Sequence, residues 1–457
     1  MLKRQIFLFI CSIYCCIGAA QQKSLPIGVF DSGTGGLTVL EAMLSLDAFN
    51  NDTGTPGPDG KPDFSGEYFQ YLADQANMPY GNYAGEKKTK LLQEHVIKNM
   101  DFLLQSKYEA LKGNQMVPQR KQGVKMLVLA CNTATAFALN EVKEHVAQTG
   151  YTAPTIGVIN AGVKAALEYQ VSHPGTVGIF ATAGTVASNG YPRTLQEMAK
   201  SKGMTAPLVV SQGGHGLADA IDRDFSFFDE QAKSFRKEYR GPSISNASWK
   251  IDTALLLQYN FKKDANKLLC EYDDKGNCLD MQLNDPENYV RYHLVSLLEK
   301  MKAEQISVPM NTLILGCTHY PFMRDTIRTV LNELYNFKQG DHYRYRSVLS
   351  PHVELIDPAI ETAKEAYVAL RSLKLENDAQ SLNDIFFITI PNKTLSEVQL
   401  QEDGWFTYAY KYGRREGENK KYVNFVQFDH RNISDATYGR IQLTLPYVYK
   451  RIVQSRN

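Results

Sequence analysis

The sequence predicts an α/β protein with two similar, doubly wound halves and a β-rich C-terminal segment. Two short apolar runs, residues 127–130 and 313–316, each lead into a cysteine followed by small polar residues. Apolar runs of this length, bounded by turn residues, are typical of buried strands. Open α/β sheets bind ligands at the carboxyl ends of their strands. We therefore expect Cys131 and Cys317 at strand ends, where two thiols could face one small substrate.

Three strand-and-turn units recur in the same order along the chain. Residues 27–36 resemble residues 177–185, the two cysteine-terminated runs resemble each other, and residues 156–162 resemble residues 355–359. Any single βα unit places apolar residues before a polar turn, so the signal lies in three matches in register. Together they indicate an internal duplication with a parallel sheet in each half.

The domain boundaries follow from this duplication and from the stretches that interrupt it. Residues 225–302 alternate aromatic and charged side chains, which indicates an insertion that ends in a helix over residues 288–302. Alternating runs after about residue 375 predict strands at residues 385–390, 404–412, 422–428 and 439–448. The expected organisation is a first α/β domain over residues 24–160, completed by about residues 350–375, a second over residues 161–345, and a C-terminal extension over residues 376–457.

The N-terminus has the pattern of a secretory signal over residues 1–20. Lys3 and Arg4 precede an apolar stretch over residues 6–17, and small residues follow at 18–20. The apolar stretch is too short for a comfortable membrane span. We expect an exported, periplasmic protein with no membrane span after cleavage.

Composition and spacing argue against two other classes of partner. The chain has 50 Lys and Arg against 49 Asp and Glu, so no charge excess indicates nucleic acid binding. Residues 50–65 are rich in Gly, Pro and Asp and predict an exposed loop, but Asp52, Asp59 and Asp63 lack the spacing of an EF-hand. We predict no metal site. Residues 107–123 are interpreted as a polar linker.

Four of the seven cysteines remain after signal removal. A chain of this length does not need a disulfide framework, so the strand-end cysteines, Cys131 and Cys317, are interpreted as chemical. Cys270 and Cys278 flank a turn sequence over residues 273–277, which allows either a local disulfide or two free surface thiols.

Two strand-end thiols suit proton transfer at a carbon centre. A thiolate beside a helix N-terminus is stabilised by the positive helix end. Glycine-rich turns at residues 31–36 and 182–185 offer backbone N–H groups to a carboxylate. One thiol could remove the α-proton of an amino acid while the other returns a proton to the opposite face, which inverts the centre without a cofactor.

Six motifs in order resemble those of the glutamate racemase family, within the cofactor-independent aspartate/glutamate racemases. They span roughly residues 26–373 and consist of Asp31-Ser32-Gly33 with Gly35-Gly36, Pro79-Tyr80-Gly81, Cys131-Asn132-Thr133, Ala181-Thr182 with Gly184-Thr185, Cys317-Thr318-His319-Tyr320-Pro321, and Asp357-Pro358.

The resemblance implies two pseudo-symmetric α/β domains with the active site at their interface and no cofactor. It implies that Cys131 and Cys317 are the acid/base residues, one for each enantiomer, assisted by Asp31 and His319. The implied substrate-binding residues are Asp31, Ser32, Tyr80, Gly81, Asn132, Thr133, Thr182, Thr318 and His319.

The chain departs from the family pattern at two places. Ala161 stands after Asn160 where the family has a proline, and the usual acidic residue after the Thr-rich turn of the second half has no clear match. His215 stands near that place and is a candidate substitute.

We therefore expect a racemase that interconverts L- and D-glutamate and binds an acidic amino acid, with a homodimer left open. The alternatives are an aspartate or broad-specificity racemase and a non-catalytic periplasmic protein that binds acidic amino acids. A binding protein has no use for two oxidisable thiols, which favours the enzyme. A one-thiol decarboxylase or isomerase is disfavoured by the second cysteine. Family racemases supply D-glutamate for peptidoglycan in the cytoplasm, so an exported one would act on an external amino-acid pool.

Overall fold

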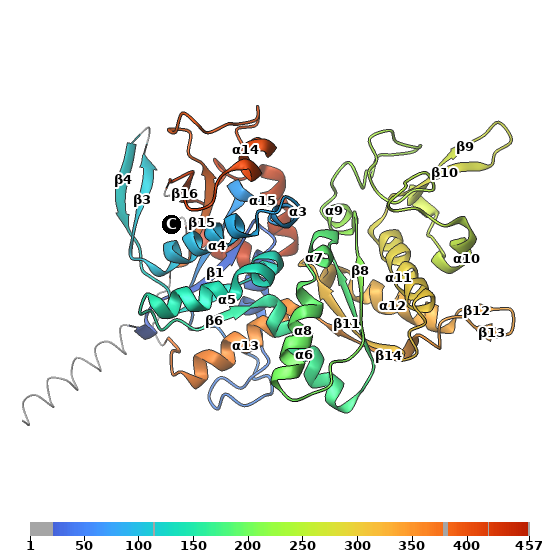
Figure 1. The fold of residues 1–457 in the computed structure, drawn as a ribbon, viewed down its shortest axis with the longest axis horizontal. Coiled ribbons are helices and arrows are strands. Elements are labelled where there is room, and N and C mark those ends of the chain that lie inside the picture. The colour runs from blue at the N-terminus through green and yellow to red at the C-terminus, as the bar shows by residue number, and fades with distance from the viewer. Residues whose placement is uncertain (1–21, 113–114, 378–382, 419, 456–457) are drawn as a thin grey trace, which may run out of the picture. The chain divides into compact units, whose positions relative to one another are not determined.

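The computed structural model describes residues 22–112, 115–377, 383–418 and 420–455. The chain divides into unit 1, Met1–Ala161 with Ala359–Asn457, and unit 2, Gly162–Pro358 (Figure 1). The predicted signal over residues 1–20 lies outside the described residues. Within the described residues, no helix combines the length and the apolar character needed to cross a bilayer.

Unit 1 is built on a six-stranded sheet with the order β16-β15-β2-β1-β5-β6. All neighbours are parallel except β15 and β16, which are antiparallel. The central strands β1, β2 and β5 are buried along their whole length, as expected from their apolar sequences. The strands are β1 (Ile27–Asp31), β2 (Phe69–Ala73), β5 (Met126–Leu129), β6 (Thr155–Gly157), β15 (Ile385–Pro391) and β16 (Val423–Gln427).

Unit 2 has a four-stranded parallel sheet with the order β14-β11-β7-β8. Its strands are β7 (Thr176–Ala181), β8 (Val209–Gly213), β11 (Met310–Gly316) and β14 (Leu349–Ile356). Read from the other edge, the order β8-β7-β11-β14 repeats the order β2-β1-β5-β6 of unit 1. The first, second, third and fourth strands of the unit 2 sheet along the chain therefore take the same positions in their sheet as β1, β2, β5 and β6 do in unit 1. This confirms the predicted duplication and fold class.

Helices of unit 1 cover the sheet through apolar faces. Helices α4 and α5 pack together over the face that presents Phe30, Leu127 and Leu129, while α2 contacts α16. The helices are α2 (Leu37–Ser45), α3 (Gly81–Gly85), α4 (Thr89–Leu104), α5 (Asn132–Gln148), α14 (Tyr408–Gly413), α15 (Asp435–Thr444) and α16 (Pro446–Gln454), with η1 (Gln75–Asn77). Helices α6 (Val158–Ser172) and α13 (Pro358–Ser372) each contain a boundary between the units.

Unit 2 contains α7 (Ala183–Ala187), α8 (Gly190–Ser201), α9 (Leu217–Ile221), α10 (Leu256–Tyr259), α11 (Pro286–Ala303) and α12 (Arg324–Asn336), with η2 (Thr253–Leu255), η3 (Asp264–Asn266) and η4 (Tyr320–Met323). The predicted helix over residues 288–302 is confirmed as α11. The Asp285 side chain caps it by accepting from the Glu287 N–H, and Pro286 stands at its first turn. Buried side chains of α11 belong to the main hydrophobic cluster of unit 2, so this end of the expected insertion is part of the core.

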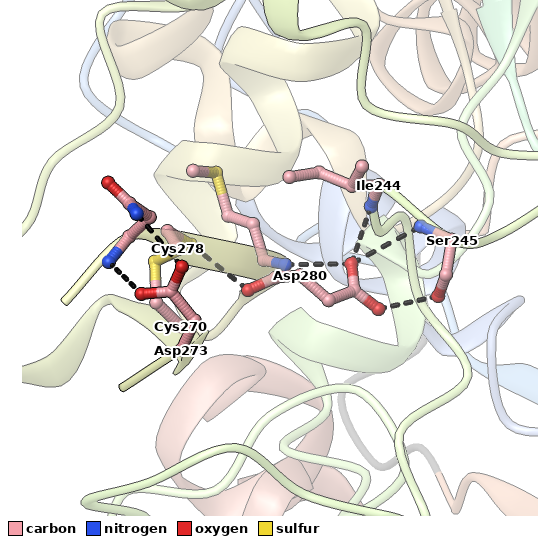
Figure 2. Close-up of a disulfide and its surroundings, with 8 residues drawn as sticks. Ile244, Ser245, Cys270, Asp273, Cys278 and Asp280 are labelled. Atoms are coloured by element: carbon pink, nitrogen blue, oxygen red, sulfur yellow. Dashed lines mark hydrogen bonds between the residues drawn. A yellow bond between two sulfur atoms is a disulfide. The ribbon is translucent and has the colours of Figure 1, made fainter. Parts of the chain in front are cut away.

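The hairpin of β9 (Leu268–Tyr272) and β10 (Cys278–Leu283) lies at the end of unit 2 away from its sheet (Figure 1). Cys270 and Cys278 form a disulfide across it, with their Cα atoms 5.5 Å apart. Figure 2 shows the Asp280 carboxylate accepting hydrogen bonds from the backbone N–H groups of Ile244 and Ser245. The disulfide alternative of the sequence analysis is therefore confirmed, and Asp280 ties the hairpin to a preceding loop.

Two predicted strands of the C-terminal extension are wrong. Residues 385–390 and 422–428 form β15 and β16 as predicted, but residues 404–412 lead into α14 and residues 439–448 lie in α15 and α16. In α15 the Ser434 side chain caps the helix by accepting from the Thr437 N–H, which favours helix over strand. The extension is also no separate body, because β15 pairs directly with β2.

Two other stretches were interpreted from composition alone. Residues 107–123 are not a plain linker, because they contain the antiparallel hairpin β3 (Lys107–Lys112) and β4 (Gln115–Arg120). Residues 50–65 form the predicted loop. Its Asp63 carboxylate accepts from the Ala48 and Phe49 N–H groups, and Asp59 accepts from Asn51. The Asp59 and Asp63 carboxylates therefore stabilise the loop by accepting hydrogen bonds from backbone N–H groups. A second short hairpin joins β12 (Lys338–Gln339) and β13 (His342–Tyr343).

Integration of the extension into unit 1 predicts a large cost for truncating its buried strand. Ile388 of β15 is fully buried, so Ile388→Ala should lower the free energy of unfolding by about 2–4 kcal/mol. Leu443 of α15 is 84% exposed, and Leu443→Ala should change it by less than about 0.5 kcal/mol. Denaturant unfolding followed by circular dichroism measures both. Equal, small effects would mean that β15 contributes little to unit 1.

Candidate active site

Cys131 lies where β5 meets α5, as the sequence predicts. Its side chain is the N-cap of α5, and its sulfur accepts from the Ala134 N–H at 3.4 Å. The thiol also donates toward the Ser32 hydroxyl, 3.5 Å away. Only 5% of Cys131 is exposed. The duplicated strand order places Ser32, after β1, beside the end of β5, and this brings two predicted site residues together.

Asp31 ends β1 and holds the glycine-rich turn that follows. Its Oδ2 accepts from the Gly36 N–H at 2.8 Å and from the Gly33 N–H at 3.2 Å. A Cβ atom at Gly36 would lie 2.4 Å from the Asp31 Cβ, so only glycine permits this close approach. The turn expected to cradle a substrate carboxylate therefore already cradles the Asp31 side chain with two of its amides.

Burial sets the protonation state of Cys131. Desolvation first, and the nearby Asp31 carboxylate second, raise the pKa of the thiol to about 12. Burial also raises the pKa of Asp31, against the hydrogen bonds from its turn. The thiolate stabilisation expected from the helix N-terminus is thus outweighed. At neutral pH Cys131 is a thiol, which is a proton donor.

Tyr80 is buried beside the first half-site, which consists of Asp31, Ser32 and Cys131. Its hydroxyl already has a hydrogen-bond partner. It donates to Asp74 Oδ2 at 2.5 Å, and its ring packs with Phe30 in the cluster that includes Cys131. Asp74 also accepts from the Asn77, Asn99 and Thr389 side chains. The remaining predicted residues of unit 1 are Gly81, which begins α3, and Asn132 and Thr133, which open α5.

Cys317 ends β11 in unit 2, also as predicted. Its sulfur lies 3.7 Å from His319 Nδ1, and the Thr318 hydroxyl lies 3.4 Å from the same nitrogen. Thr182 occupies the corresponding end of the neighbouring strand β7. Its hydroxyl caps α7 by accepting from the Thr185 N–H at 3.3 Å, and donates to the Thr185 hydroxyl at 3.0 Å. These four predicted residues lie on two adjacent strand ends of the sheet.

Asp222 is a partner of His319 that the sequence analysis missed. The Nε2 atom of His319 lies 3.0 Å from Asp222 Oδ2, at the end of α9. Burial lowers the pKa of His319, but hydrogen bonds to Asp222 and Cys317 outweigh it and raise the pKa to about 10. His319 is therefore an imidazolium at neutral pH. It is charged beside the Cys317 sulfur.

His215, the candidate substitute for the usual acidic residue of the second half, is held by its neighbours. Its Nε2 bonds the Arg240 carbonyl at 2.9 Å, and its ring stacks on Trp249 with centroids 4.9 Å apart. Asp222 stands seven residues later, in a run with Asp219 and Asp224. That acidic run after a Gly-Gly-His turn is a signal that could have indicated the carboxylate.

The described ranges contain no group of three or more His, Cys, Asp and Glu side chains that could hold an ion.

The chain was compared with known proteins. No family model matches it. It is 26% identical over 352 residues to a glutamate racemase of Thermus thermophilus, covering 77% of this chain and 82% of the relative. A glutamate racemase of Oceanobacillus iheyensis is 26% identical over 310 residues, with 67% and 72% covered. One of Ralstonia nicotianae is 27% identical over 308 residues, with 67% and 70% covered.

Solved structures give weaker superpositions. A glutamate racemase isoform of Bacillus anthracis has a TM-score of 0.46 at 23% identity, covering 80% of this chain and 89% of the other. A glutamate racemase of Francisella tularensis in complex with D-glutamate has a TM-score of 0.44 at 22% identity, covering 80% and 88%. The sequence relatives and the ordered motifs carry the assignment. The chain is a homologue of the glutamate racemases and an isomerase of the amino-acid racemase type.

Proposed function

We propose that the protein interconverts L- and D-glutamate by two-base proton transfer at Cα, using Cys131 and Cys317 and no cofactor. The observation that carries this is the matched pair of strand-end thiols, each with its own ionisable partner. Asp31 accompanies Cys131, and the Asp222–His319 pair accompanies Cys317. Glutamate is the substrate because the sequence relatives are glutamate racemases.

The two thiols have opposite resting roles in this proposal. The His319 imidazolium directs its Nδ1–H toward the Cys317 sulfur, while the raised pKa of Cys131 leaves that cysteine with its proton. In one direction Cys317 takes the α-proton of one enantiomer and Cys131 gives its proton to the opposite face. The product leaves with the two cysteines in exchanged protonation states. The reverse direction begins with Cys131 as the thiolate, and Asp31 assists the proton's departure.

Polar groups at the same strand ends would hold the substrate. The Ser32 hydroxyl accepts from the Cys131 thiol, Thr318 follows Cys317 directly, and Thr182 follows β7, the strand beside β11. The helix-opening amides of Asn132 and Thr133 suit a carboxylate. A carbanion at Cα would place negative charge beside donors of this kind. Donors fixed before the reaction stabilise it without reorganisation.

The proposal also includes the location of the enzyme. The pattern of residues 1–20 supports export, so the enzyme would act on amino acids outside the cytoplasm rather than on peptidoglycan precursors. The disulfide between Cys270 and Cys278 is compatible with an oxidising compartment. Fractionation of expressing cells tests this part separately from the chemistry.

Incubation of the purified mature protein with L-glutamate should yield D-glutamate without added pyridoxal phosphate, metal or nucleotide. In deuterated water, solvent deuterium should appear at Cα, because each thiol exchanges its proton with solvent between turnovers. Chiral chromatography with mass spectrometry measures both, and L-aspartate and L-alanine tested in parallel define specificity. Racemisation without deuterium uptake would contradict the two-thiol mechanism.

Replacing either strand-end cysteine should abolish turnover in both directions. A serine hydroxyl is a far weaker acid than a thiol, so Cys131→Ser and Cys317→Ser should each lose at least about 10²–10⁴-fold in kcat. The control is the double variant Cys270→Ser, Cys278→Ser, which removes two cysteines that form the hairpin disulfide and should stay active. If one strand-end variant kept near-normal rates, that cysteine would be structural.

Asp222→Asn should remove the charge that keeps His319 protonated. The pKa of His319 should fall from about 10 toward its ordinary value of about 6.5, where only about 3% remains charged at pH 8. We expect a roughly 30-fold lower kcat at pH 8, with the loss recovered toward pH 6. Asp224→Asn, an exposed neighbour, should keep the wild-type pH profile.

The same pair links stability to pH. The His319 pKa is raised in the folded state, so the pair's stabilisation is complete below about pH 6.5 and is lost as pH rises toward about 10. Urea unfolding of the wild type should show this decline over that range, and Asp222→Asn should flatten it. Identical pH dependences of the two proteins would show that Asp222 does not control His319.

A further inference from the structure

A cavity of about 380 Å³ lies within unit 1, apart from the thiol half-site. It is formed by α4, the β3–β4 hairpin, β16 and the chain that leads into β16. Figure 1 shows the hairpin beside β15 and β16, and β3 contacts β16. The volume is in the range of small-molecule sites. Part of its wall is apolar, where the stacked rings of Phe102 and Phe425 have centroids 3.9 Å apart.

Basic side chains outnumber acidic ones around this cavity. The acidic residues of the lining are Asp101, which pairs with His145, and Glu109, which pairs with Lys421. The buried His95 is neutral, because burial and the Arg414 charge hold its pKa well below 6.5. The basic lining residues are Lys98, Lys107, Arg414, Lys420 and Lys421.

Arg414 is a buried cation with no carboxylate partner among the described residues. It is only 6% exposed, and its guanidinium packs over the rings of Phe406, Tyr410 and Tyr422. Its Nη2 donates to Asn77 Oδ1 at 2.6 Å and its Nε to the Lys411 carbonyl at 3.2 Å.

The Nη1 atom of Arg414 has no hydrogen-bond partner. The Tyr83 hydroxyl lies close enough to the guanidinium to interact with it, but a hydroxyl cannot neutralise the charge. Asp74 reaches Arg414 only through the Asn77 amide, which donates to Asp74 and accepts from Arg414. Buried charges in proteins are normally paired, so an unpaired guanidinium at a cavity calls for an anion.

We propose that this cavity binds a small oxyanion, a carboxylate or a phosphate, with Arg414 as its principal partner. A guanidinium presents parallel N–H groups that match two oxygens of either anion. Lys98 and Lys107 add positive charge at the exposed side of the lining, while the Phe102 and Phe425 rings accept an apolar portion of an organic acid. The site belongs to unit 1 alone and does not depend on the racemisation proposal.

Isothermal titration calorimetry on the full mature protein, with sodium phosphate and separately with sodium citrate at fixed ionic strength, tests the site. Saturable binding of at least one anion is expected. Phosphate alone would identify a phosphate ligand, and citrate alone a carboxylate ligand. Arg414→Met should weaken binding at least tenfold. No saturable heat with either anion, or unchanged affinity in Arg414→Met, would overturn the proposal.

A second pair of variants keeps the test decisive if Arg414→Met fails to fold. Lys98 and Lys90 are both exposed lysines of α4, but only Lys98 lines the cavity. Lys98→Glu should weaken anion binding at least threefold, whereas Lys90→Glu, with the same change in net charge, should stay within twofold of the wild type. Equal effects of the two reversals would mean a diffuse surface attraction and would also overturn the proposal. Because the readout is binding heat, a failed racemase assay leaves the result intact.

Discussion

The Asp31 carboxylate is the group around which the first half-site is folded. It is buried at the end of β1 and takes two amide hydrogen bonds from the turn that leads into α2. Those bonds draw Gly36 against the Asp31 side chain, which fixes where the turn runs and where Ser32 stands. Ser32 in turn accepts from the Cys131 thiol. Without this carboxylate the turn would lose two hydrogen bonds, and Cys131 would lose the second of the two causes that raise its pKa.

The two thiols occupy corresponding strands but differ in electrostatics. Burial, and after it the nearby Asp31 carboxylate, raise the pKa of Cys131, so its proton is held tightly. Cys317 lies beside an imidazolium whose charge is supported by Asp222. The two cysteines therefore occupy equivalent backbone positions in the duplicated fold. The ionisable side chains beside them differ in sign, because Cys131 has a carboxylate neighbour and Cys317 an imidazolium neighbour.

The repeated strand order followed from the sequence because its cues are local. Apolar runs, glycine turns and the residues after each strand end lie within ten residues of one another, and in a parallel sheet they fix where side chains emerge. Tyr80 belongs to the buried cluster that includes Cys131, but its hydroxyl is bound to Asp74. That bond depends on a network drawn from η1, α4 and β15, which no local pattern reveals.

Other features required tertiary information. Asp222 meets His319 across 97 positions of sequence, and only the packing of α9 beside the end of β11 brings them together. The second strand of each half, β2 and β8, was missed because it lies outside the three units that recur along the chain. Residues 439–448 alternate between apolar and polar, yet Ser434 caps α15, and α16, which follows it, packs against α2. In this stretch, helix capping and packing determine the secondary structure, and the alternating pattern does not.

The order of the sheet in unit 1 has a consequence for how the chain folds as it is made. Unit 2 is one continuous segment and is complete once Pro358 has emerged. Unit 1 needs β15 and β16, from the last quarter of the chain, to finish a sheet that began at Ile27. Domains generally fold as units during synthesis. Unit 2 can therefore be folded while unit 1 still has β2 as an unpaired edge strand. Until β15 is made, that edge needs protection from pairing with other strands.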